Sequence, residues 1–219
     1  MTAILSEETK ARDAIVSVGK SLFDRGLTFG STGNISLKLS TGETLMTPTN
    51  ASLGALDPAR LSRFSAEGVH ESGDKPTKEA FLHQCMYCKR PESAAVVHLH
   101  STHSVAVSIL ADIDPEEVLP PLTAYYVMRV GSLPLVPYFP PGDTALAEAV
   151  AEKADRHHAV LLANHGPVVA AKDLEAAVYA MEELEETARL ALLTRGLNPR
   201  MLAEAEIRDV VDHFDVEWD

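Results

Sequence analysis

The chain has 219 residues, of which 46% are hydrophobic, and it carries a formal net charge of −13. This length and composition suffice for one substantial core, so we expect residues 1–219 to form a single domain. The excess of acidic residues argues against nucleic acid and anionic membranes as partners. The sequence has no apolar stretch of membrane-spanning length and no secretory signal, so we expect a cytoplasmic protein without a membrane partner.

A helix and two hairpins are predicted in the first third of the chain. Apolar residues recur at helical spacing from Ser6 to Arg25, and Gly26 marks the end of this amphipathic helix. A loop of small residues at 30–34 leads into alternating apolar and polar residues at 35–47, which predict a hairpin. A second hairpin is expected at 61–71.

The next predicted helix begins close to an acidic residue. Thr77 is a candidate N-cap, and apolar residues at helical spacing extend the helix to about Lys89. Glu79 then lies in the first turn. On position alone, the best interpretation is a carboxylate that the helix dipole stabilises at the helix N-terminus. Beside a bound metal, the same carboxylate would suit proton transfer. Cys85 and Cys88 are expected to be reduced thiols on this helix.

Three histidines follow apolar segments that are typical of buried strands. Side chains alternate along a strand, so His98 and His100 point to the same side after the apolar residues 94–97. His165 follows a second such segment and precedes Gly166. Three imidazoles with a fourth position left open are typical of a catalytic metal site, whereas a single histidine at a strand end is often a hydrogen-bonded core residue. The pattern alone leaves both interpretations open.

The remaining segments alternate between helices and strands. Helices are expected at 101–110, 144–157, from Asp173 to about Gly196, and after Asn198-Pro199 to near His213. Strands are expected at 133–136, 159–163 and 168–171. Ser101 or Thr102 is the expected cap of the first of these helices, and the acidic run 182–186 is expected to be a solvated helix face. Hairpins interleaved with helices predict an α/β fold, a mostly antiparallel sheet covered by helices on both sides.

Three pairs of residues in loops supply the groups that bind an anion such as a phosphate. They offer small residues, hydroxyls, amides, one ammonium group and a helix N-terminus. The pairs are Gly33-Asn34, Thr49-Asn50 and Thr77-Lys78. Each pair alone is an ordinary loop.

Taken together, the motifs at 31–36, 47–49, 76–79, 96–101 and 161–166 resemble the class II aldolase/adducin family. The resemblance implies a three-layer α/β/α fold. It also implies one Zn²⁺ per subunit, or another divalent metal, held by His98, His100 and His165. Glu79 would be the acid/base that can also approach the metal.

The resemblance further implies how substrate and subunits are arranged. The substrate phosphate would lie at Gly33, Asn34, Thr49, Asn50, Thr77 and Lys78. The family typically forms a homotetramer with active sites near subunit interfaces, in which a tyrosine of a neighbouring subunit donates a proton. Tyr125 is our candidate, with Tyr126 as the alternative.

Two departures from the sugar-phosphate aldolases narrow the expected chemistry. Thr77 and Lys78 replace two serines before the acidic residue, and Asn50 replaces a glycine. The motifs at 75–79, 98–103 and 119–125 resemble the branch of 3-oxo-tetronate 4-phosphate decarboxylases, which implies a lyase that releases CO₂ and dihydroxyacetone phosphate. A phosphorylated sugar acid is thus the expected substrate. An L-fuculose-1-phosphate type aldolase and a non-catalytic module like the adducin head are the alternatives.

Overall fold

The central feature of the fold is an eight-stranded sheet, formed by the residues that the computed structural model describes, 2–140, 143–214, 216 and 218. Its strands lie in the order β4-β3-β2-β1-β5-β8-β7-β6, and neighbouring strands are antiparallel except β6 and β7. The strands are β1 (Asn34–Lys38), β2 (Thr44–Met46), β3 (Ser62–Phe64), β4 (His70–Ser72), β5 (Ala95–His98), β6 (Leu135–Val136), β7 (Ala159–Leu162) and β8 (Gly166–Ala171). The mostly antiparallel α/β fold predicted from the sequence is confirmed.

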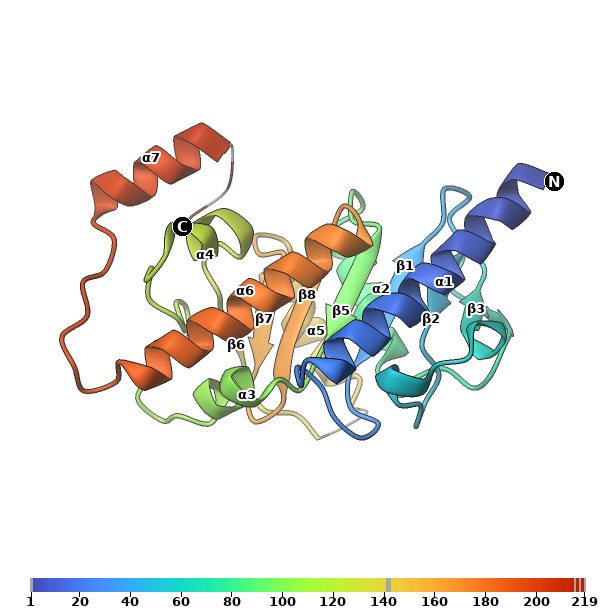
Figure 1. Ribbon diagram of the computed structural model, residues 1–219, viewed down its shortest axis with the longest axis horizontal. Coiled ribbons are helices and arrows are strands. Elements are labelled where there is room, and N and C mark those ends of the chain that lie inside the picture. Colours follow the sequence, from blue (N-terminus) through green and yellow to red (C-terminus); the bar gives the residue numbers. More distant parts are fainter. Residues whose placement is uncertain (1, 141–142, 215, 217, 219) are drawn as a thin grey trace.

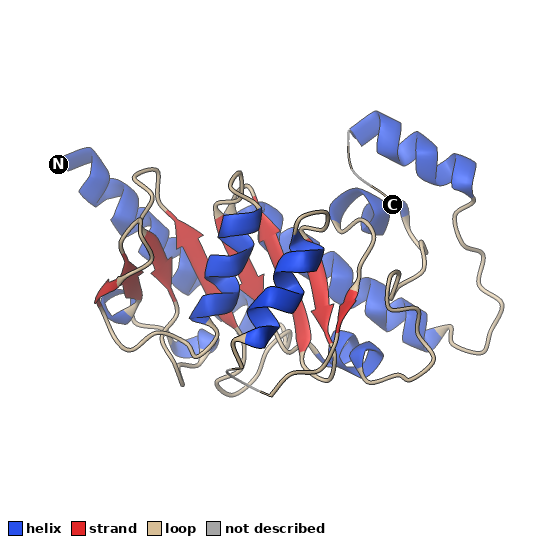
Figure 2. Cartoon of the chain, turned by 180° about the vertical axis from the view of Figure 1, so that it is seen from behind, coloured by secondary structure: helices blue, strands red, loops and turns tan. Residues whose placement is uncertain are grey.

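Helices cover both faces of this sheet. Helices α1 (Thr2–Asp24), α3 (Thr102–Ser108) and α6 (Leu174–Leu193) lie on the face seen in front in Figure 1. Helices α2 (Ala80–Lys89) and α5 (Ala145–Ala154) lie on the opposite face, seen in front in Figure 2. Helix α4 (Ala124–Arg129) contacts both α6 and α7 (Glu204–Phe214), and two short 3-10 helices are η1 (Leu53–Ala55) and η2 (Pro58–Arg60). The expected three-layer α/β/α arrangement is therefore present.

Side chains of the central strands alternate between two hydrophobic cores. In β5, Ala95 and Val97 join the core under α1 and α6, whereas Val96 packs toward α2 and α5. In β7, Leu161 and Val160 divide between the two cores in the same way. Both faces of these strands are buried, which explains why their sequences are continuous apolar runs.

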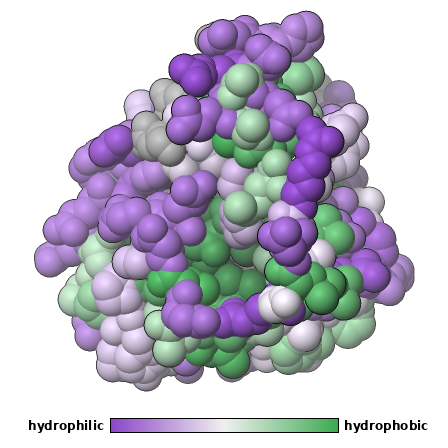
Figure 3. Space-filling model, turned by 90° about the vertical axis from the view of Figure 1, so that its left-hand side faces the viewer, coloured by the Kyte–Doolittle hydropathy of each residue, from purple (hydrophilic) through white to green (hydrophobic). Residues whose placement is uncertain are grey.

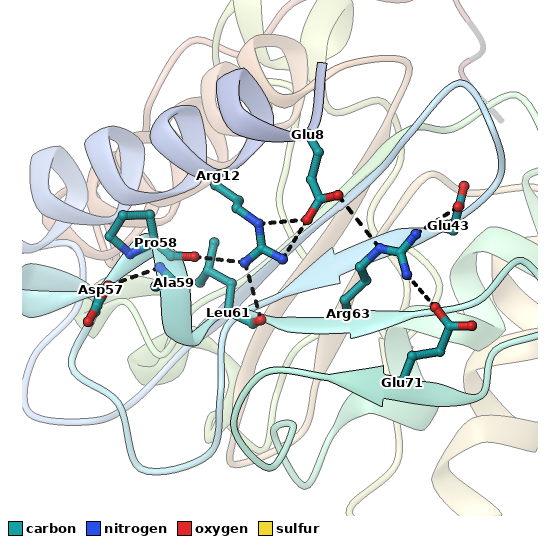
Figure 4. Close-up of polar contacts among 9 residues, drawn as sticks. All are labelled: Glu8, Arg12, Glu43, Asp57, Pro58, Ala59, Leu61, Arg63 and Glu71. Carbon is teal, nitrogen blue, oxygen red and sulfur yellow. Dashed lines mark hydrogen bonds and ion pairs between the residues drawn. The ribbon is translucent and has the colours of Figure 1, made fainter. Parts of the chain in front are cut away.

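Two arginines tie α1 to the strands at one edge of the sheet (Figure 4). The guanidinium of Arg12 donates to the carbonyls of Pro58 and Leu61, at 2.7 and 3.4 Å. Arg63, in β3, forms ion pairs with three carboxylates, those of Glu8, Glu43 and Glu71. Because Glu8 also pairs with Arg12 at 2.7 Å, the two guanidinium groups share one network.

Helix α2 begins later than the sequence predicts. Its first residue is Ala80, and Glu79 precedes it rather than lying in the first turn. The chain before the helix is held by a bridge between Pro48 and Pro76. The Thr77 hydroxyl accepts a hydrogen bond from the Glu79 N–H at 3.3 Å, so Thr77 contacts the start of the helix without being its N-cap.

The N-terminus of α3 is capped from α6 rather than by its own first residues. The carboxylate of Glu185 accepts hydrogen bonds from the backbone N–H groups of His103 and Ser104, both at 2.9 Å. Ser101 instead donates its hydroxyl proton to the Leu27 carbonyl. The prediction of a solvated acidic face at 182–186 is thus wrong for Glu185, whose side chain is only 13% exposed.

The segment before α7 has no regular secondary structure where the sequence predicts a helix. Helix α7 begins at Glu204, because the Leu202 N–H donates to the Pro121 carbonyl and so holds this segment along the 120s loop. The Glu206 carboxylate accepts from the Ala203 N–H at 2.8 Å, which supplies the cap expected from Asn198. Among the described residues, no helix is long and apolar enough to cross a membrane.

Candidate metal centre

His98 is the most buried residue of the site and ends the central strand β5. It is paired with Asn34 in β1 on one side and with Val168 in β8 on the other, and its exposed fraction is 0%. Its Nδ1 lies 2.8 Å from the Pro167 carbonyl oxygen. Because a carbonyl only accepts, Nδ1 carries the proton, and the lone pair of Nε2 points into the site.

His100 and His165 converge with His98 on one point. The ring centroids of the three imidazoles lie 4.6 to 4.9 Å apart, and the Nε2 atoms of His98 and His100 are separated by 3.1 Å. His165 lies in the turn between β7 and β8, next to Gly166. A Cβ at Gly166 would lie 2.2 Å from the Leu99 carbonyl oxygen, so only glycine allows the turn to approach this closely.

Glu79 completes the group with a carboxylate. Its Oε1 lies 3.0 Å from Nε2 of His165, and its Oε2 lies 3.5 Å from Nε2 of His98. Burial alone would raise the pKa of Glu79, but the neighbouring imidazoles of His98 and His165 and a hydrogen bond from Asn34 lower it overall. The side chain is therefore an ionised carboxylate at neutral pH.

The donor set fits a divalent metal ion. One ligand atom from each of Glu79, His98, His100 and His165 lies within 4.8 Å of the others. Burial, together with the other histidines, lowers the pKa of His100 to about 3, so its imidazole is neutral. Two imidazole nitrogens 3.1 Å apart, beside a carboxylate, are an arrangement that a cation stabilises.

The three expected anion-binding pairs are brought together beside this centre. The Thr49 N–H donates to the Lys75 carbonyl at 2.9 Å, so the loop with Thr49-Asn50 runs beside the one with Thr77-Lys78. The Asn34 amide donates to the Thr77 hydroxyl at 3.2 Å and to Oε2 of Glu79 at 2.7 Å. A Cβ at Gly33 would lie 3.0 Å from the His98 carbonyl oxygen. Phosphate binding at these residues stays a prediction.

Tyr125 is not brought to the metal centre within one chain. It lies in α4, whereas α3 follows His100 and so marks the end of the sheet that carries the metal centre. Helices α4 and α3 are at opposite ends of β7 and β8 in Figures 1 and 2. Tyr125 is 59% exposed, and its ring centroid lies 5.7 Å from the Arg129 guanidinium carbon. Tyr126 is fully buried, with its ring against Trp218. A role for Tyr125 therefore requires a neighbouring subunit, and it too stays a prediction.

Two polar residues near the site were not singled out from the sequence. His83, in α2, and Ser36, in β1, are both fully buried and hydrogen-bond to each other at 2.7 Å. His83 also contacts Asn34. A signal was available in the spacing, because His83 is four residues after Glu79 and Ser36 is two residues after Asn34 on the same side of a strand.

Comparison with known proteins gives a family match and two groups of relatives. Residues 13–192 match the family model described as the Class II Aldolase and Adducin N-terminal domain. A 3-oxo-tetronate 4-phosphate decarboxylase of Pectobacterium atrosepticum is 49% identical over 95% of both chains. An L-fuculose phosphate aldolase of Escherichia coli is 32% identical over 95% of both chains.

A solved structure gives the same result for the fold. The crystal structure of YgbL from Escherichia coli superposes with a TM-score of 0.91 at 46% identity, covering 93% of this chain and 98% of that one. The family match spans most of the chain and includes the elements that carry the three histidines and Glu79. The chain therefore belongs to the class II aldolase and adducin N-terminal domain family.

Proposed function

We propose that this chain is a metal-dependent decarboxylase that converts 3-oxo-tetronate 4-phosphate to dihydroxyacetone phosphate and CO₂. The observation that carries the proposal is the convergence of three imidazoles and the ionised Glu79 beside the 33–34, 49–50 and 77–78 loops. Relatives that are 45–49% identical over nearly the whole chain are named as decarboxylases of this substrate. Their residue identity supports transfer of the activity.

Decarboxylation of this substrate needs a group that accepts the electron pair of the broken bond and a group that donates a proton. The substrate carries a carboxylate at C1, a hydroxyl at C2, a ketone at C3 and a phosphate at C4. The C1–C2 bond breaks, its electron pair moves into a C2–C3 double bond as the C3 carbonyl accepts charge, and CO₂ leaves. C2 then takes up a proton. A divalent metal supplies, when bound, the positive charge that polarises such a carbonyl.

Glu79 is our candidate for delivering the proton to C2. Its lowered pKa means that the carboxylate must first receive a proton from another group. The phenol of Tyr125 from a neighbouring subunit is the candidate source. Its exposed position on α4 supports such a contact between subunits.

The loops beside the centre are our candidates for holding the substrate anions. The hydroxyls of Thr49 and Thr77 and the amide of Asn50 would bind the C4 phosphate together with the backbone at Gly33. Lys78 brings one positive charge to a substrate that has two anionic groups. We propose that this charge restricts the substrate specificity to phosphorylated sugar acids.

Zinc, a homotetramer and a cytoplasmic location are finer parts of the proposal. Three nitrogen donors and one oxygen donor suit Zn²⁺, with another divalent metal as the alternative. Exposed hydrophobic side chains on α6 and after it support contacts between subunits, among them Leu193, Leu197 and Met201. Figure 3 shows hydrophobic residues in a hollow on the surface that forms the left-hand side of Figure 1. Residues of 107–122 and 191–199, at the C-terminal end of α6, line a cavity of about 350 Å³. A charged sugar phosphate does not cross membranes unaided, which supports the cytoplasm.

Product analysis tests the activity directly. Metal-loaded protein is incubated with 3-oxo-tetronate 4-phosphate made in situ, beside a sample with L-fuculose 1-phosphate. We expect CO₂ and dihydroxyacetone phosphate from the first substrate, and no aldehyde from the second. Glu79→Gln should abolish CO₂ release while the three histidines still bind metal. Release of aldehyde without CO₂ would contradict the proposal.

A sugar-phosphate aldolase is the second candidate, supported by the 32% identity to L-fuculose phosphate aldolase. The same electron movement serves both reactions, with an aldehyde leaving in place of CO₂. The metal-ligand group argues against a non-catalytic module like the adducin head. One equivalent of divalent metal per chain after purification would support an enzyme of either kind.

A further inference from the structure

A line of buried polar side chains extends from Glu79 away from the metal centre. The amide of Asn34 contacts Glu79 through Nδ2 and His83 through Oδ1. His83 Nδ1 lies 2.7 Å from the Ser36 hydroxyl, which lies 2.8 Å from the Tyr87 hydroxyl. Asn34, Ser36 and His83 are at most 4% exposed, so water does not replace these contacts.

Sequence spacing explains why these groups meet. Asn34 and Ser36 are two residues apart in β1 and therefore point toward the same face, the one covered by α2. His83 and Tyr87 are four residues apart in α2 and lie on the same side of that helix. The two pairs thus form one layer between β1 and α2.

The hydrogen bonds that link Glu79, Asn34, His83 and Ser36 have one consistent direction. Asn34 presents Nδ2, which can only donate, to Oε2 of Glu79, and Oδ1, which can only accept, to Nε2 of His83. His83 must then carry its proton on Nε2, which leaves Nδ1 to accept from the Ser36 hydroxyl. Burial lowers the pKa of His83 to about 3, which agrees with a neutral ring.

We infer that His83 is a positioning residue, which fixes the amide of Asn34 so that its N–H faces the Glu79 carboxylate. Without a donor at the position of His83 Nε2, the amide of Asn34 can turn over and place its oxygen against the carboxylate. Glu79 would then lose a hydrogen bond and move from its place beside His165. The kinetic part of this inference rests on the proposed function, whereas the hydrogen-bond direction does not.

The first test measures which ring nitrogen of His83 carries the proton, and it does not depend on enzyme activity. Side-chain ¹⁵N NMR of the full-length protein at neutral pH should show His83 protonated on Nε2 and unprotonated on Nδ1. Comparison with His83→Gln assigns the signal. A proton on Nδ1 would mean that Asn34 is turned the other way, and it would overturn the inference even if the protein has no decarboxylase activity.

The second test separates positioning from packing. His83→Phe keeps a ring but removes the donor, and we expect kcat to fall by about 10- to 100-fold with KM within about threefold of its original value. His83→Gln places an amide N–H near the position of Nε2 and should recover most of kcat. Metal bound per chain at saturating metal concentration should be unchanged in both variants, because the three histidines of the metal centre are untouched even where Glu79 moves.

A matched control reduces hydrophobic packing in the same helix without changing a hydrogen bond. Met86 is fully buried in α2 and has no polar contact with Asn34, so Met86→Val should lose stability while its kcat stays the same. Unchanged kcat in His83→Phe would overturn the inference. So would a His83→Gln variant that is as slow as His83→Phe, because the donor would then not be what matters.

Discussion

Replacing Gly166 by alanine should damage the metal centre through the backbone alone. The new Cβ would lie 2.2 Å from the Leu99 carbonyl oxygen and 3.3 Å from the His100 Cα. Ordinary contact between such atoms needs roughly 3.5 Å, so the β7–β8 turn must separate from residues 99 and 100 by about 1 Å. His165 is attached to one side of this gap and His100 to the other.

The expected loss can be estimated from this displacement. Metal–nitrogen distances tolerate changes of about 0.2 Å, so we expect metal affinity to fall by at least about 100-fold. The strain should also lower the free energy of unfolding by about 2 to 3 kcal/mol. Affinity is measured by competition with a chromophoric chelator, and stability by urea denaturation of the metal-free protein.

Gly196→Ala is the matched control for this variant. Gly196 has a φ of +78°, but a Cβ there would meet nothing within 4 Å. The substitution should cost about 1 kcal/mol of stability and leave metal affinity unchanged. If Gly166→Ala bound metal as tightly as the original protein, the close approach of the turn to Leu99 would not be what places His165.

Three further predictions concern stability, measured by urea denaturation. Arg12→Met should lower the free energy of unfolding by about 1 to 2 kcal/mol, because two backbone carbonyls lose their donor. The control Lys20→Met, at an exposed ion pair, should lower it by less than about 0.5 kcal/mol. Equal losses in the two variants would contradict this reasoning. Glu185→Ala should cost about 1 to 2 kcal/mol, because the α3 N–H groups lose their acceptor, with exposed Glu186→Ala as the neutral control. Acid should destabilise the metal-free protein, since folded His83 stays neutral with a pKa of about 3 whereas the unfolded residue gains a proton near pH 6.5. Stability is then lost as pH falls through 6.5, by about 2 kcal/mol from pH 7 to 5 for this residue, and an identical loss in His83→Gln would refute its contribution.

Much of the metal centre could be predicted because it depends on local alternation. His98 and His100 lie on one side of the chain for the same reason that Ala95 and Val97 share a core. The turn at His165 was marked by the glycine after it. Short-range spacing, combined with apolar runs that mark buried strands, was therefore enough to make the three histidines candidates, whereas their assignment to a metal needed the resemblance to the family.

The contacts that could not be predicted join residues far apart in the chain. Glu79 loses its place in the first helical turn because the bridge between Pro48 and Pro76 holds the preceding chain extended. Glu185 caps α3 from more than 80 residues away, so no local pattern marks it. The Tyr125 prediction needs a neighbouring subunit, and a single sequence contains no distance between subunits.

The position of β5 between β1 and β8 has a consequence for the order in which the protein is built. During synthesis, β1 to β4 precede β5, so one half of the sheet can pair before the ribosome has made the rest. The opposite edge of β5 stays open until β8 emerges, and His165 reaches His98 and His100 only with that pairing. An ion held by all three histidines would thus mark a nascent chain whose two halves have joined.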